Sequence, residues 1–232
     1  MQNAREGDVV RLPDRGPSWI VVDFDLSKVV VARWPGKLWR VRIQEAANPR
    51  DQDAVGGPPT NQATYVRVIS VEVVVEESPH LLFGAHGAKL LPLLESAARL
   101  SHSDADLLAN ARHPAAATAY DRVMRRWAKH QNITISSDAL DGVLKIDGGS
   151  PINGALSVLY RIINDRAHAM DGAKASTVTD DEVYLAEPWA SAAKVMLDAA
   201  LALGAPHLAE GRDREALLSG WLSLSSASGA RT

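Results

Sequence analysis

The densest group of basic side chains in this sequence lies on a predicted helix over residues 114–131. Arg122, Arg125, Arg126 and Lys129 fall within eight residues, and three of them recur at i, i+4 and i+7, which places them on one helix face. A row of such groups can donate charge-assisted hydrogen bonds to several phosphates, and this binding weakens as salt is raised. The cluster therefore indicates nucleic-acid contact. An acidic protein surface as partner, or simple hydration of an exposed face, are the alternatives.

A second pair of arginines lies on a predicted strand near the N-terminus. Arg40 and Arg42 alternate with Trp39, Val41 and Ile43, so the two sets of side chains point to opposite faces. Arginines beside aromatic residues would resemble the nucleic-acid-binding surface of a small barrel. The alternative is that tryptophans fill the core of that barrel while the arginines are hydrated. We expect the two arginines to assist the helix cluster in binding.

No catalytic motif accompanies these basic residues. The sequence contains no P-loop, no Gly-x-Ser-x-Gly, no His-Glu-x-x-His, no dinucleotide-binding glycine pattern and no cysteine. Asp165, His168 and Asp171 are spaced three apart, but steps of three drift around a helix, and no second ligand motif accompanies them. The sequence therefore favours a non-enzymatic protein with no catalytic residues, no cofactor and no metal.

The amino-acid composition changes near Ser78, and with it the type of secondary structure predicted to position the basic residues. Residues 1–77 contain 15 valines and 6 alanines, whereas residues 78–232 contain 6 valines and 30 alanines. Valine favours strands, and alanine favours helices. The composition predicts an α+β protein with a small N-terminal β domain over 1–77, an all-α helical bundle domain over 78–224 and a disordered tail over 225–232.

Five short strands are predicted in the first domain, over residues 8–12, 19–23, 28–34, 38–43 and 64–76. Turn-forming residues separate the first four strands, and a polar stretch from 44 to 62 precedes the last. Five strands in about 70 residues, mostly linked by hairpins, suit an SH3-like barrel, and an OB-like barrel is the alternative.

The first part of this domain resembles a known family. The residues concerned are Gly7-Asp8-Val9-Val10 with Leu12, then Gly16-Pro17, Val30, Trp34 and Gly36. Their order is similar to the pattern of the small bacterial YodC-like family, whose members share an SH3-like fold and whose function is not established. The resemblance covers residues 7–43, and Arg15 stands where the family has a glycine. It implies the SH3-like barrel and carries no catalytic residue across.

Proline, glycine and capping patterns predict the helices of the second domain. These lie over residues 88–100, 103–112, 114–131, 137–145, 150–171, 179–203 and 213–224. Ser103 with Asp106, and Thr179 with Glu182, are the predicted capping boxes, and Pro188 is expected to kink or divide its helix. The helix 150–171 carries the wide apolar stripe that is typical of the centre of a bundle.

The net charge and hydropathy of the chain further limit the class of protein that it can be. The 232 residues carry a net charge of −3, from 25 basic and 28 acidic residues, and contain no apolar run long enough to span a membrane. Since a general polyanion-binding domain would usually be basic, nucleic-acid contact must depend on a local patch. We expect a cytoplasmic binding or adaptor protein of bacterial or phage type. The alternatives are an assembly protein that forms a homo-oligomer, and an enzyme with a site between the domains.

Overall fold

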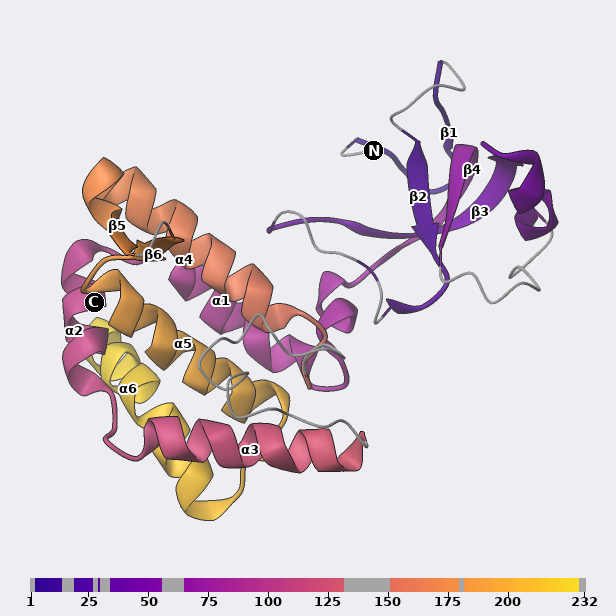
Figure 1. Cartoon of the computed structure of the whole chain (residues 1–232). Coiled ribbons are helices and arrows are strands. Elements are labelled where there is room, and N and C mark those ends of the chain that lie inside the picture. The colour runs from indigo at the N-terminus through magenta and orange to yellow at the C-terminus, as the bar shows by residue number, and fades with distance from the viewer. Residues whose placement is uncertain are drawn as a thin grey trace. The chain divides into compact units, whose positions relative to one another are not determined.

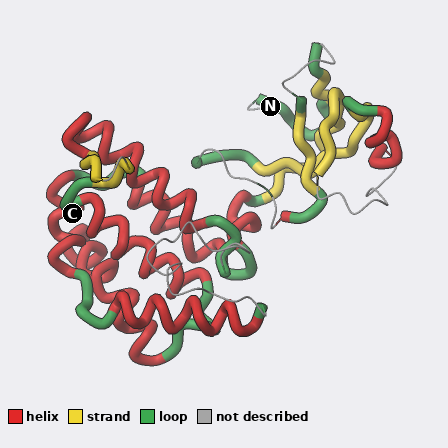
Figure 2. The backbone as a smooth tube through the Cα atoms, viewed as in Figure 1, coloured by secondary structure: helices red, strands yellow, loops and turns green. Residues whose placement is uncertain are grey.

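The computed structural model divides into two compact units, Met1–Leu82 and Phe83–Thr232 (Figure 1). It describes residues 3–13, 19–26, 29, 34–55, 65–131, 151–179 and 182–229. The four-stranded sheet lies in the first unit and the α-helices lie in the second, so the protein is α+β (Figure 2). The sequence places the boundary after Glu77, which is the last residue of strand β4, whereas the units divide after Leu82.

The first unit is built around one long strand, β4 (Tyr65–Glu77). Along one edge β4 pairs antiparallel with β3 (Leu38–Ala46), and along the other it pairs first with β2 (Ile20–Asp23) and then with β1 (Val9–Arg11). A 3-10 helix, η2 (Pro49–Val55), follows β3. The length of β4 therefore lets one strand hold three others in a single sheet.

The apolar core of this unit forms where alternate residues of the strands meet. Val66, Val68 and Val71 of β4 are buried together with Ile43 of β3 and Ala54 of η2. Partly buried side chains pack against them, namely Val10, Ile20, Val22, Val41 and Val55. Because β-branched side chains pack well on a pleated surface, the valine-rich composition accounts for this core.

The turn before β1 depends on a glycine, Gly7. Its φ of 85° lies in the left-handed region that favours glycine, and its N–H donates to the carbonyl oxygen of Val73 at 2.8 Å. This turn sets the start of β1 against β4.

Four of the five predicted strands are confirmed with small shifts of their ends. The fifth, predicted over 28–34, lies outside the described residues apart from Val29 and Trp34. The described strands form an open sheet around β4 rather than a closed barrel.

The second unit surrounds a central helix, α5 (Trp189–Gly204), of whose residues twelve are buried. The helices around it are α1 (Leu91–Ala97), α2 (His102–Ala111), α3 (Ala116–His130), α4 (Ala155–Asp171) and α6 (Gly211–Gly229). Each contacts α5. Small residues allow close packing: a Cβ added at Gly204 would lie 2.5 Å from Cγ2 of Ile152. Short 3-10 turns occupy Pro79–Phe83, Gly87–Leu90 and Gly172–Ala175.

The predicted helix 179–203 is wrong in its first part. It begins only at Trp189, and the residues before it form a hairpin of β5 (Ser176–Thr179) and β6 (Glu182–Leu185). Two causes are plain in the sequence. Val178 and Val183 are β-branched, and a proline such as Pro188 disfavours helical backbone in the residue before it.

Two other boundaries differ. The capping box of α2 uses Ser101 and Asp104, two residues before the predicted pair Ser103 and Asp106. The helix α6 continues to Gly229, through the first part of the segment predicted as a disordered tail. The predicted helix 137–145 lies outside the described residues. Among the helices that the structure describes, none combines the length and apolar character needed to cross a membrane.

Candidate functional site

The helix α3 carries the predicted basic cluster on its exposed side. Val123, Met124 and Trp127 are buried against the bundle. The four basic residues Arg122, Arg125, Arg126 and Lys129 are all exposed. The sequence therefore separated the two faces of this helix correctly.

Tertiary contacts divide the cluster into two halves. Asp213, in the first turn of α6, is buried and lies against both Arg122 and Arg126. Nε and Nη2 of Arg122 donate to Oδ1 of Asp213 at 3.0 and 2.5 Å, and Nη2 of Arg126 lies 2.8 Å from Oδ2. Nη1 of Arg126 also donates to the carbonyl oxygen of Leu208 at 2.7 Å. These two arginines therefore fasten α3 to the N-terminal end of α6.

The contacts of Asp213 with Arg122 and Arg126 explain the pKa of its carboxyl group. Hydrogen bonds from Arg122, joined by those from Arg126, hold the pKa of Asp213 below its usual range. A negative side chain in the first turn of α6 also complements the helix dipole. The arginine side chains remain 47% and 44% exposed, so each guanidinium is fixed in direction but still accessible.

The other half of the cluster has no such partner. Within the described residues, Arg125 and Lys129 make no ion pair and no side-chain hydrogen bond, and both are exposed one helical turn apart. Arg125 and Lys129 are therefore the two members of this cluster that no described residue neutralises.

The two arginines predicted on the strand are paired with glutamates across the sheet. Arg40 forms an ion pair with Glu77, and Nη1 of Arg42 lies 2.8 Å from Oε2 of Glu72. Lys37 is paired with Glu76 in the same way at 3.1 Å. Each of these three basic side chains is therefore neutralised by a glutamate of β4, and Arg40 and Arg42 do not form an unpaired basic patch.

A cluster that the sequence did not single out lies on β2 and β4. The guanidinium carbon of Arg67 is 5.1 Å from the ring centroid of Trp19 and 5.9 Å from that of Tyr65. The two rings are 36% and 46% exposed, and Arg67 is exposed between them. Arg67 pairs with Val21 in register, and Val21 is itself 54% exposed. We call Trp19, Tyr65 and Arg67 the aromatic–arginine cluster.

Part of this cluster had a signal in the sequence. Tyr65 and Arg67 are two residues apart in a predicted strand, so their side chains share a face. That Trp19 lies beside them depends on the pairing of β2 with β4, across more than 40 residues of chain. No local pattern specifies that register.

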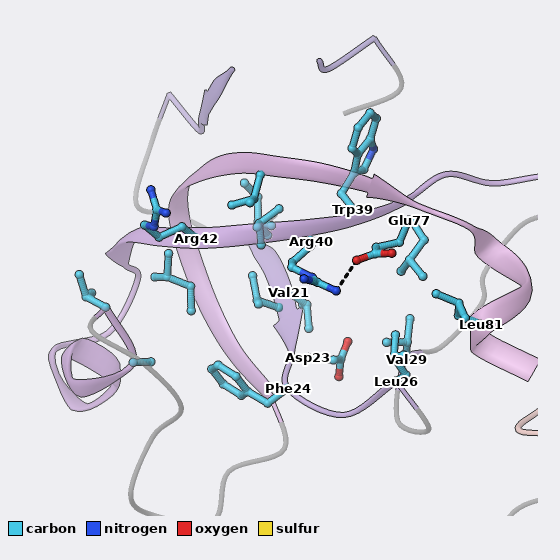
Figure 3. A pocket seen from close by; sticks show the side chains of 18 residues that line it. Val21, Asp23, Phe24, Leu26, Val29, Trp39, Arg40, Arg42, Glu77 and Leu81 are labelled. Atoms are coloured by element: carbon cyan, nitrogen blue, oxygen red, sulfur yellow. Dashed lines mark ion pairs between the residues drawn. The ribbon is translucent and has the colours of Figure 1, made fainter. Parts of the chain in front are cut away.

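The first unit also contains a groove of about 810 Å³ (Figure 3). Its walls are mostly apolar and include Val21, Phe24 and Leu26. The ion pair of Arg40 with Glu77 lies at this groove, and Asp23 points into the same space. Partial burial raises the pKa of Asp23. Residues 27–28 and 30–33, on either side of the lining residue Val29, lie outside the described part of the chain.

The histidine and aspartates spaced along α4 do not gather into a metal site. Oδ2 of Asp171 accepts a hydrogen bond from Nε1 of Trp189 at 2.6 Å and lies 2.8 Å from Nδ1 of His102. These two contacts hold the pKa of Asp171 below its usual range. His168 instead lies 3.2 Å from the hydroxyl of Ser176. Among the residues that the structure describes, no group of three potential ligands is placed to hold a metal ion.

In comparisons with known proteins, the chain matches no family model, no curated protein and no solved structure. The surfaces described above therefore carry the information on its function.

Proposed function

We propose that the protein is a non-enzymatic binding protein whose β unit contacts single-stranded nucleic acid through Trp19, Tyr65 and Arg67. The observation that carries this proposal is the guanidinium of Arg67 lying within 6 Å of two exposed aromatic rings. Unpaired bases stack on aromatic rings and on arginine planes, whereas bases within a duplex are already stacked on one another. The cluster therefore fits single strands better than duplexes.

The cations of α3 support the same ligand class. Arg125 and Lys129 offer exposed charge to phosphates, and Arg122 and Arg126 present guanidinium groups whose direction Asp213 fixes. Phosphate contacts position a protein on nucleic acid without reading its sequence, and stacking is also tolerant of base identity. We therefore propose weak sequence preference.

For the fold of the β unit, the SH3-like barrel remains our proposal. The strands around β4, the turn at Gly7 and the resemblance to the YodC-like family support it. The predicted strand 28–34 would supply the fifth strand of such a barrel.

The direct test is binding of fluorescein-labelled oligo(dT) and oligo(rU), followed by fluorescence anisotropy at low salt. We expect the wild-type protein to bind both, and the double variant Trp19→Ala/Tyr65→Ala to bind at least about 10-fold more weakly, since each stacked base contributes about 1–3 kcal/mol. Tyr184→Ala is the matched control, because Tyr184 is 47% exposed against 46% for Tyr65 and lies in the other unit. Equal losses in the two variants would contradict the role of the cluster.

A second variant tests the helix. Arg125→Gln/Lys129→Gln removes the two free cations, so the slope of log K against log salt should become shallower by about 1.4, at about 0.7 for each lost contact with a single strand. Wild-type protein that binds neither oligonucleotide at low salt would overturn the proposal. An acidic protein partner would then be the better explanation of the α3 cluster.

A further inference from the structure

The hairpin of β5 and β6 is largely exposed: six of its eight strand residues are exposed. Val178 and Val183 face each other across the hairpin, and each is 68% exposed. Tyr184, on the opposite face of the ribbon, is 47% exposed. Only its base is fixed: Leu185 is buried, and the N–H of Ala186 donates to the carbonyl oxygen of Ala175 at 2.8 Å. Two large apolar side chains are therefore placed together in solvent.

The ribbon is also incomplete as a sheet. Within the described residues, β5 and β6 pair only with each other, so each strand has an edge whose backbone groups have no strand partner. Isolated two-stranded hairpins are marginally stable in water, and a third strand or a packed face is normally needed.

The edge of β5 lacks the features that normally prevent pairing with another chain. Natural proteins protect such edges with lysine, proline or a bulge. The strand reads Ser176-Thr177-Val178-Thr179, which has no charge and no proline and is rich in β-branched residues. The edge of β6, in contrast, carries Glu182 and leads to Pro188.

We propose that β5 pairs antiparallel with β5 of a second copy of this chain, which joins the two hairpins into one four-stranded sheet. A two-fold axis at β5 makes the surface self-complementary, as an isologous dimer requires. It also brings the Val178–Val183 pairs of the two copies onto one continuous apolar face.

Charge complementarity favours a second copy over an unrelated partner. Lys174, exposed just before β5, has no ion pair within the described residues, and Glu182 lies at the other end of the hairpin. In an antiparallel pair the basic end of one hairpin lies beside the acidic end of the other, so the two ends attract each other twice per dimer.

The test is the mass of the full chain in solution, measured by light scattering after gel filtration from about 1 to about 100 μM, because dimerisation follows mass action. We expect twice the chain mass of 24.9 kDa at the upper end of this range. Val178→Lys places like charges close to the two-fold axis and should give a monomer. Val9→Lys is the matched control, since Val9 is 62% exposed on the edge strand of the other unit, and it should remain a dimer.

Exchanging the charges of Lys174 and Glu182 distinguishes an effect on dimerisation from an effect on folding. Lys174→Glu should weaken the dimer, and Lys174→Glu/Glu182→Lys should partly restore it, while the melting temperature and helical circular dichroism of all variants stay close to wild type. Wild type that is monomeric throughout the range would overturn the proposal. So would a dimer that survives Val178→Lys. The measurement needs no nucleic acid, so it is independent of the proposed function.

Discussion

The two units of this protein place the same kinds of charged residue in different surroundings. On the sheet of the first unit, Arg42 and Glu72 form an ion pair whose side chains are 63% and 30% exposed. In the helical unit, the carboxylates of Asp198 and Asp213 are only 4% and 8% exposed. Water can replace a lost partner on the sheet, but it cannot reach the buried carboxylates as readily. The arginines of the helical unit therefore hold the bundle together, whereas those of the sheet mainly balance surface charge.

The largest expected difference between the units follows from removing one arginine from each. Nε of Arg112 donates to Oδ2 of Asp198 on α5 at 2.9 Å. Arg112→Met leaves that carboxylate buried without its partner, so we expect a loss of about 2–4 kcal/mol in the free energy of unfolding at neutral pH. Arg42→Met, the same change on the exposed sheet, should cost less than about 1 kcal/mol. Urea denaturation measures both, and equal losses would show that burial does not separate the two units.

The pH dependence of stability gives a second test of the burial of charged groups in the helical unit. Burial raises the pKa of Asp198 to about 6, in spite of the opposing hydrogen bond from Arg112. The folded protein then keeps a proton that the unfolded chain has released, so the stability contributed by Asp198 is present below about pH 4 and is lost as the pH rises through about 6.

Asp198→Asn removes this dependence. Between pH 4 and 7.5 the wild-type protein should lose on the order of 3 kcal/mol relative to the variant, which is the raised pKa converted at about 1.4 kcal/mol for each pH unit. Asp213 behaves in the opposite sense: its pKa is lowered, so its contribution is lost only as the solution becomes strongly acidic. Parallel profiles of the free energy of unfolding against pH for wild type and Asp198→Asn would contradict the raised pKa of Asp198.

The smallest expected effect concerns Tyr120, whose charge environment includes Asp198. Burial, followed by the charges of Asp198 and Asp121, raises the pKa of the Tyr120 hydroxyl. Among the described residues, that buried hydroxyl has no hydrogen-bond partner. Tyr120→Phe should leave the melting temperature unchanged or raise stability by up to about 1 kcal/mol, because it removes an unpaired polar atom. A loss of more than about 1 kcal/mol would show that the hydroxyl is hydrogen-bonded in solution.

Sequence patterns correctly predicted the elements whose secondary structure is specified by their own residues. The segment 64–76 was predicted as a strand and forms β4, and the spacing of Arg122, Arg126 and Lys129 predicted the exposed face of α3. They wrongly predicted a helix at 179–188, because acidic residues before an apolar segment resemble the start of a helix. There the β-branched valines and Pro188 favoured a hairpin instead.

The candidate sites depended on longer-range contacts. The sequence does not distinguish the four basic residues of α3 by partner. Asp213, which lies 91 residues from Arg122 along the chain, binds Arg122 and Arg126, whereas the other two have no ion pair among the described residues. The aromatic–arginine cluster appears only when β2 is placed beside β4.

Three features can be read from the residues alone: the α+β composition, the division into a valine-rich and an alanine-rich part, and the inner and outer faces of α3. These follow from residue propensities and from periodicities of two and 3.6, which act over a few neighbouring residues. Tertiary contacts, in contrast, determine which cations are neutralised, which aromatic rings meet and which strand edge stays open. Each of these depends on how distant segments pack, and packing is set by the shape and register of whole elements rather than by any local pattern.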